Sequence, residues 1–382
     1  MQQPARKAAC GIDYGTTGTA VAWGLDYGGP GEFPAIDQLR HWPAQDAIKV
    51  PSRIQYPEAL QSRWGFETTP ELETYQWTKF LLDNSLEARD LRDEELEDVS
   101  GQGLMRLPAG KSAARVVGDY LGHIRKQIQA LPGFRREDPV RKEYWFAIPA
   151  SWANDAQQQM QEAIRLAGFG EDPHEEVCIV TENEASAISM IEADGRHVEP
   201  GNTLCVCDVG GGTICNEHIT VAHGTEQRHE PQGWQYSDRT GVHETHADRF
   251  NRSFTSVFSA SAAQREGLMS DFGRIKRRFT GNGASHFLTF HMDCYASEYY
   301  DYEPLTGQIT LSDDDLRTLF GHVIDKVIKV VNDQLSRTTR GHFKIDKLLM
   351  TGGLMHSEYV RKMISDAFKF IGFEKILFSE NL

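Results

Sequence analysis

Residues Leu204–Thr213 read LCVCDVGGGT, and this stretch decides the predicted fold. Its first part is apolar and small, which is typical of a buried strand, and three glycines and a hydroxyl follow. Because glycine has no Cβ, its backbone N–H groups can come close to a phosphate oxygen. Asp208 closes the strand, where a carboxylate can serve a hydrated metal ion or a general base. Taken alone, a glycine turn that merely closes a hairpin remains the commoner explanation.

A second stretch of the same design lies near the N-terminus. Ala9–Thr17 reads ACGIDYGTT, a small-residue strand that leads to Asp13, Gly15 and the two hydroxyls of Thr16 and Thr17. Two such hairpins can grip a polyphosphate from both sides, while their aspartates hold a hydrated Mg²⁺ between them. The pair of stretches therefore favours a nucleotide site over two unrelated turns.

Composition limits the class of protein and its partners. The chain has 382 residues, enough for two domains, and 40% of them are hydrophobic. No apolar run approaches the length of a membrane span, and the first residues lack the apolar core of a signal peptide. A net charge of -15 weighs against nucleic acid or an anionic membrane as the main partner.

Six cysteines show neither a CxxC pair nor a regular framework. Most of them lie in or beside predicted strands, where a free thiol behaves as a small apolar residue. We therefore expect a reduced, intracellular protein in the cytoplasm. The six are Cys10, Cys178, Cys205, Cys207, Cys215 and Cys294.

Hydrophobic periodicity predicts alternating strands and helices, which is typical of the α/β class. In the first half we expect a hairpin over 8–25, strands over 48–56, 143–149 and 178–181, and helices over 111–131, 154–168 and 184–192. Asn154 is the expected N-cap of its helix, and Gly168 its stop. In the second half we expect hairpins over 204–221 and over 286–292 with 308–311, a strand over 347–351, and helices over 245–258, 313–335 and 357–370.

Two single residues allow both a structural and a functional interpretation. Lys79 sits among aromatic and aliphatic neighbours, either as a surface lysine with a buried stem or as a cation that reaches a γ-phosphate. Glu182 lies where a strand meets a helix, either as an acid that favours the helix N-terminus or as a group that faces a cleft.

Two further segments are weaker signals. The basic run Gly273–Phe279, GRIKRRF, is only a short stretch in an acidic protein, so a nucleic-acid patch is not indicated. The segment His243–His246 differs from a zincin helix because its histidines are three residues apart rather than four.

The order of motifs resembles a known family. GIDYGTT, IPASW, TENEASA, DVGGGT, GRIKRRF and LLMTGG occur in the order seen in the actin-like ATPase superfamily. The closest resemblance is to the ATPase domain of the seventy-kilodalton heat-shock protein family. The tryptophan after IPA and the form TENEA resemble the divergent branch of that family.

This resemblance implies an actin-like ATPase fold with two lobes, each a mixed sheet flanked by helices, and a nucleotide cleft between them. Lobe I is expected over 8–198 and lobe II over 199–382. The resemblance assigns phosphate contacts to Asp13, Gly15, Thr16, Thr17, Gly210, Gly211, Gly212 and Thr213, and adenosine contacts to Lys276, Arg277, Gly352 and Gly353. It makes Asp208, Lys79 and Glu182 catalytic, with Mg²⁺ held through water by Asp13 and Asp208.

The chain departs from the family pattern in several places. Cys215 stands where a second metal-side aspartate is expected, Gly273 where an acidic residue usually contacts the nucleoside, and Gly241 alone replaces a glycine pair. The sequence ends at Leu382, whereas the family continues with a returning helix and a substrate-binding domain. We therefore expect a truncated ATPase module with slow turnover and without a peptide-binding domain.

Three functions remain open from the sequence. The first is an ATP-binding, chaperone-like or regulatory ATPase with protein clients or co-chaperones. The second is a module that binds nucleotide without hydrolysis, and the third is a small-molecule kinase of the same superfamily.

Overall fold

A computed structural model describes residues 7–27, 35–58, 61–69, 71–83, 105–193, 198–199, 201–210, 213–220, 227–228, 235–236, 271–283, 285–289, 302–303, 305–340, 345–369, 371, 373 and 375–379. The predicted helix over 245–258 lies outside them, as do Gly241 and Cys294. Among the described residues, no helix combines the length and the apolar character needed to cross a membrane.

The described chain falls into two compact units, one up to Ala185 and the other from Ser186 onward. The chain passes from one unit to the other between Ala185 and Ser186, within helix α5 (Glu182–Ala193). This point comes before residue 198, after which the sequence analysis divides the two lobes.

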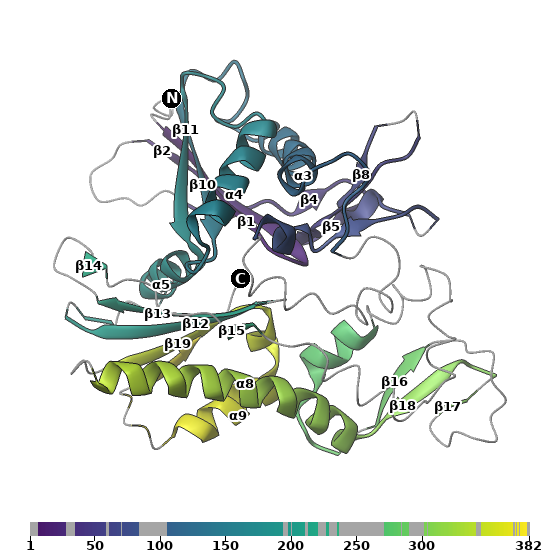
Figure 1. Ribbon diagram of the computed structural model, residues 1–382, viewed down its shortest axis with the longest axis vertical. Coiled ribbons are helices and arrows are strands. Elements are labelled where there is room, and N and C mark those ends of the chain that lie inside the picture. Colours follow the sequence, from purple (N-terminus) through teal and green to yellow (C-terminus); the bar gives the residue numbers. More distant parts are fainter. Residues whose placement is uncertain are drawn as a thin grey trace. The chain divides into compact units, whose positions relative to one another are not determined.

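The first unit is built on a six-stranded mixed sheet (Figure 1). Its strand order is β11-β10-β1-β2-β3, and β6 also pairs with β2. β1, β10 and β11 run parallel, whereas β2 is antiparallel to β1 and pairs antiparallel with β3 and β6. The strands are β1 (Lys7–Tyr14), β2 (Gly18–Asp26), β3 (Asp37–Gln38), β6 (Lys49–Pro51), β10 (Arg141–Ile148) and β11 (Glu175–Thr181).

The second unit contains a six-stranded sheet of the same design. Its order is β14-β13-β12-β19-β20, and β15 also pairs with β13. Here β12, β19 and β20 run parallel, and β13 is antiparallel to β12, β14 and β15. The strands are β12 (Thr203–Val209), β13 (Thr213–Thr220), β14 (Gln227–Arg228), β15 (Gln235–Tyr236), β19 (Lys347–Thr351) and β20 (Lys375–Phe378).

The two sheets therefore match strand for strand, in order and in direction. In the first, Asp13 lies in register between Ala20 of β2 and Ala147 of β10. In the second, Asp208 lies in register between Cys215 of β13 and Thr351 of β19. The repeated design thus places one aspartate at the same position near the end of the first strand of each sheet.

Helices cover these sheets by burying one apolar stripe each. In the first unit, α3 (Ala113–Ile128) packs closely on α4 (Asn154–Leu166), and Tyr120 of α3 contacts the ring of Tyr14 on β1. Because side chains alternate along a strand, Asp13 points to the face of the sheet opposite to Tyr14.

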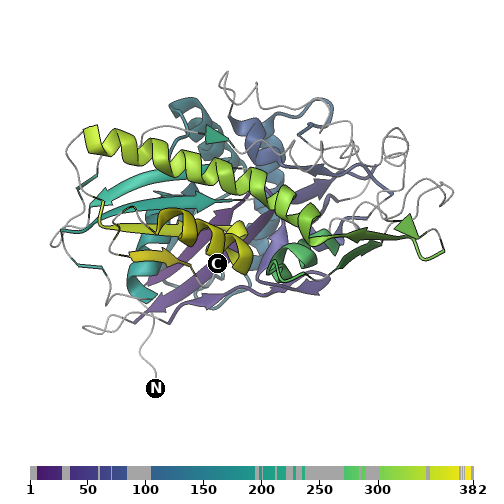
Figure 2. The same cartoon turned by 90° about the horizontal axis from the view of Figure 1, so that it is seen from below.

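In the second unit, α8 (Asp313–Arg340) and α9 (Glu358–Phe368) lie on one face of the sheet (Figure 2). They share a core with the sheet residues Cys205 and Cys207. Helix α5 packs against the alternate residues Leu204 and Val206 of the same strand. The second sheet therefore has helices on both faces, which agrees with the mixed sheet flanked by helices that the resemblance implies.

Short elements complete the described chain. In the first unit they are β4 (His41–Trp42), β5 (Gln45–Asp46), β7 (Arg53–Gln55), β8 (Arg63–Trp64), η1 (Gly65–Glu67), β9 (Tyr75–Gln76) and η2 (Thr78–Leu82). In the second they are β16 (His286–Thr289), β17 (Tyr302–Glu303), β18 (Gln308–Leu311) and η5 (Gly353–His356).

Several predicted boundaries differ from the structure. Asn154 is wrong as the N-cap, because Ala153 holds that position without a side-chain cap and Asn154 is already helical. The strand predicted over 48–56 is broken at Ser52 into β6 and β7, which pair with different partners. Helix α8 extends to Arg340, beyond the predicted residue 335, and Gly168 ends α4 with a positive φ as predicted.

The α3–α4 contact yields a stability prediction. A Cβ on Gly118 would lie 2.8 Å from the Leu166 Cβ and 3.0 Å from the Ala163 carbonyl oxygen, whereas a Cβ on Gly122 meets nothing nearer than 4.0 Å. We expect Gly118→Ala to lower the free energy of unfolding by about 1–3 kcal/mol through overpacking. Gly122→Ala should raise it by up to about 1 kcal/mol, because alanine favours the helix. Urea unfolding of both variants checks the opposite signs.

Candidate functional site

The first hairpin turns tightly between β1 and β2. The Gly15 N–H donates to the Gly18 carbonyl at 3.2 Å, and a Cβ on Gly15 would lie 2.6 Å from that same oxygen. Thr16 is half-buried and Thr17 is exposed. Within the part of the chain that the structure describes, neither threonine hydroxyl takes part in a hydrogen bond. The turn therefore holds its shape through its backbone and leaves both hydroxyls available to a ligand.

Asp13 is joined by a lysine that the sequence did not single out. The Lys49 Nζ donates to the Asp13 Oδ2 at 2.9 Å, and both side chains are only about two-thirds buried, at 39% and 37% exposure. Burial alone would raise the pKa of the Asp13 carboxyl, but the ammonium groups of Lys49 and Lys79 hold it below its ordinary value. Asp13 is therefore ionised at neutral pH.

The structure brings Lys79 and Glu182 together as a buried ion pair between the Lys79 Nζ and the Glu182 Oε1. Lys79 lies in η2 and is 7% exposed, so it is not a surface lysine, and its ammonium lies 5.8 Å from the centroid of the Trp152 ring. Removal of either partner would leave an uncompensated buried charge.

Glu182 is the first residue of α5, which fits the helix-dipole interpretation as well as the contact with Lys79. Thr181 precedes it and forms a capping box with Glu184, since each backbone N–H is accepted by the other side chain at 3.1 Å. This cap fixes the start of α5 and with it the position of the Glu182 carboxylate.

In the second unit, the structure places Asp208 next to the turn that follows β19. Gly352 has a φ of +98°, and a Cβ there would lie 2.4 Å from the Asp208 Oδ1 and 2.4 Å from the Val209 carbonyl oxygen. Gly353 begins η5, and a Cβ on it would meet nothing within 4 Å. Of the two glycines in this predicted adenosine turn, only Gly352 lies so close to other atoms that a side chain would clash with them.

The rest of the predicted second hairpin is described in part. Gly210 follows β12 directly and Thr213 begins β13, whereas Gly211 and Gly212 lie outside the described residues. The backbone register places Cys215 directly opposite Asp208.

Lys276 and Arg277 lie on a helical segment over 271–278. Ile275 of this segment and Phe279, which follows it directly, are buried in the core of the second unit, and Phe279 stacks on Phe320. The basic pair lies off this buried stripe, with Lys276 half-buried and Arg277 exposed.

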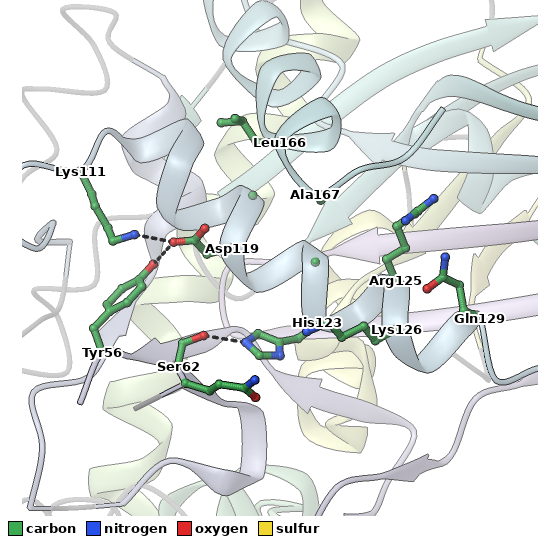
Figure 3. A pocket seen from close by; sticks show the side chains of 13 residues that line it. Tyr56, Ser62, Lys111, Asp119, His123, Arg125, Lys126, Gln129, Leu166 and Ala167 are labelled. Carbon is green, nitrogen blue, oxygen red and sulfur yellow. Dashed lines mark hydrogen bonds and ion pairs between the residues drawn. The ribbon is translucent and has the colours of Figure 1, made fainter. Parts of the chain in front are cut away.

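A surface groove of about 490 Å³ in the first unit was not predicted (Figure 3). Asp119 accepts from Lys111 at 2.7 Å, and the Ser62 Oγ lies 2.8 Å from the His123 Nε2. Burial, and then Lys126, lower the pKa of His123 to about 4, so its imidazole is neutral at pH 7. The groove is lined by Tyr56, Gln61, Ser62, Lys111, Gly118, Asp119, Gly122, His123, Arg125, Lys126, Gln129, Leu166 and Ala167.

Two of the cations that line the groove are already paired with carboxylates. Lys111 already pairs with Asp119, and Arg125 donates to both carboxylate oxygens of Glu175 at 3.2 Å. The spacing of Asp119, His123 and Lys126 along α3 marks one helix face, but that pattern alone is typical of a solvated surface.

Comparison with known proteins supports the resemblance at a distance. No protein-family model matches the chain. The chain is a distant homologue of human heat shock 70 kDa protein 12B, a divergent member of the heat-shock-70 family, with 28% identity over 205 residues. The match covers 49% of this chain and 28% of that protein, so the chain spans less than a third of the length of its relative.

The crowding at Gly352 makes a testable prediction. Gly352→Ala should destabilise the protein by roughly 1–3 kcal/mol from its backbone conformation alone, and the contact with Asp208 adds to this. Gly353→Ala is the matched control and should change stability by less than about 0.5 kcal/mol. Thermal unfolding of both variants tests this, and equal melting temperatures would contradict the assigned turn.

Proposed function

We propose that this protein is an ATP-binding, heat-shock-70-like protein with an actin-like fold that hydrolyses ATP slowly. One observation carries the proposal, namely that two sheets of identical strand order each place an aspartate, Asp13 or Asp208, just before a glycine turn. The distant homology to a heat-shock-70 protein supports the ATP-binding part of this proposal.

The first hairpin fits a polyphosphate. Its turn is fixed by the Gly15 N–H, and the hydroxyls of Thr16 and Thr17 can donate to phosphate oxygens. Lys49 and Lys79 supply positive charge in an otherwise acidic chain, and each is held by a carboxylate. The resemblance assigns the second phosphate loop to Gly210, Gly211, Gly212 and Thr213, and the adenosine contacts to Lys276, Arg277, Gly352 and Gly353.

The described residues fit Mg²⁺ less well than they fit a polyphosphate. Among the described residues, no group of three or more histidine, cysteine or acidic side chains is placed to hold a metal ion. The Asp13 carboxylate, which the resemblance assigns to the hydrated ion, already accepts from the Lys49 ammonium. The residues around Asp13 therefore do not fit a metal ion as well as they fit an ammonium group.

The roles of the protein groups follow from charge and burial. Lys79 would stabilise the charge that develops on the γ-phosphate, because a buried cation acts strongly where water is scarce. Glu182 would hold that ammonium in place, as it does in the structure. Asp208 would orient or deprotonate the attacking water, the role that the resemblance gives it.

The wider role that we propose is chaperone-like or regulatory, with protein clients or co-chaperones as partners. A module that binds nucleotide without hydrolysis is the main alternative, since Cys215 and not an acidic residue lies opposite Asp208. A small-molecule kinase would produce a phosphorylated product instead of free phosphate.

Nucleotide binding is the first test. Isothermal titration of the protein with ATP should give binding, and Gly15→Ala should weaken it tenfold or more because the Cβ clashes with the Gly18 carbonyl. Gly11→Ala on the preceding strand β1 is the control, since its Cβ meets nothing within 4 Å. If the wild type gives no heat of ATP binding, or if the two variants bind ATP with equal affinity, the proposed site is wrong.

Slow turnover has its own test. The residue in register with Asp208 is a cysteine, and a thiol adds no carboxylate beside Asp208. Cys215→Asp should therefore raise the rate of phosphate release, and Asp208→Asn should abolish it. If Cys215→Asp leaves the rate unchanged while Asp208→Asn abolishes it, Cys215 does not limit turnover.

A further inference from the structure

We propose that Lys49 is a built-in cation of the nucleotide site and occupies the place at Asp13 that a hydrated divalent ion would take. ATP binding should then depend little on added Mg²⁺. This inference rests on the proposed function, because it concerns how the same site balances the charge of its nucleotide.

The geometry comes from three neighbouring strands. Asp13 of β1 is in register with Ala20 of β2, and Ala20 is in register with Lys49 of β6. Residues in register across a sheet point to the same face, so the three side chains form one row. Strands lie about 4.8 Å apart, which puts the Lys49 backbone roughly 10 Å from that of Asp13.

A lysine stem can span this distance only if the middle residue leaves room. Ala20, in register between the two, has only a methyl group, and a Cβ built on Gly18 of the same strand would lie 3.5 Å from the Lys49 Cβ. These small residues leave the room, and the Lys49 Nζ donates to the Asp13 Oδ2 at 2.9 Å. The contact is therefore set by the sheet register and by small residues on β2.

The charges around the row are balanced in pairs. Asp13 pairs with Lys49 and Glu182 pairs with Lys79, and the charge of Lys79 also acts on Asp13. A nucleotide brings several negative charges to the first hairpin, which a divalent ion would otherwise help to neutralise. An ammonium has three N–H donors, so Lys49 can hold the Asp13 carboxylate while it donates to a phosphate oxygen.

A divalent ion would bind less strongly beside Asp13 than in a site with free carboxylates. Mg²⁺ keeps most of its waters and is held in proteins by one or two carboxylates together with substrate phosphates. Here one expected carboxylate is engaged by an ammonium. The residue in register with the other, Asp208, is Cys215.

The test measures ATP affinity by isothermal titration in excess Mg²⁺ and in EDTA. The wild type should bind ATP in both with affinities that differ by less than about threefold. Lys49→Met should bind in Mg²⁺ but lose about tenfold or more in EDTA, because the built-in cation is gone. Lys49→Arg should behave as the wild type.

Two further variants test whether the effect is specific to Lys49 and to its contact with Asp13. Lys7→Met is the matched control, because Lys7 is also 39% exposed and also pairs with a carboxylate, Glu143, at 3.1 Å, but at the opposite end of β1. It should leave both affinities unchanged. Ala20→Val keeps every charge but places a branched side chain between Lys49 and Asp13, so it should make binding depend on Mg²⁺ as Lys49→Met does.

The outcomes separate the inference from the function on which it rests. If the wild type binds no ATP in either buffer, the proposed function fails. If ATP binds the wild type and Lys49→Met with the same dependence on Mg²⁺, nucleotide binding stands and the role of Lys49 is wrong.

Discussion

Backbone crowding at one glycine in each unit is the constraint on which the arrangement of the candidate residues depends. A side chain at Gly15 would collide with the Gly18 carbonyl, and one at Gly352 would collide with Asp208 and the Val209 carbonyl. Glycine is needed at both places because the chain turns there within contact distance of itself. These turns fix where each sheet presents its aspartate, so the chemistry of the site is decided by backbone shape before any charge is considered.

Two ion pairs are the second feature of the candidate residues. In the first unit, Asp13 with Lys49 and Lys79 with Glu182 form two ion pairs of unequal burial. The buried pair is costly to break, because either partner alone would be a charge without compensation. The half-exposed pair is screened by water and can rearrange around a ligand at lower cost. We infer that Lys79 and Glu182 form a rigid pair and that Asp13 and Lys49 can rearrange around a ligand.

Much of this architecture could be predicted from the sequence, because local patterns specify it. The strand over 347–351 and the helix over 111–131 depend on short-range periodicity. The strand is found as predicted, and α3 (Ala113–Ile128) lies within the predicted helix. The prediction that Asn154 is the N-cap of its helix was wrong. Residue type favours a cap, but backbone geometry decides which residue takes that position.

Features that depend on distant partners could not be predicted. Lys49 meets Asp13 only because β6 pairs with β2, and nothing in the residues around Lys49 indicates that pairing. The groove beside α3 was missed for the same reason, since Ser62 and His123 come from separate segments. The matched strand order of the two sheets likewise requires the structure, although the repeated Asp and Gly in the sequence pointed to it.

The central claim is that the two matched hairpins are the nucleotide-binding elements. Hydrogen–deuterium exchange with and without ATP tests it most directly, because backbone N–H groups that bind phosphate exchange more slowly. We predict that ATP protects peptides covering residues 13–19 and 208–214, while peptides from the groove face of α3 are unchanged. Protection confined to α3 and the segment around Ser62, with both hairpins unaffected, would contradict the account.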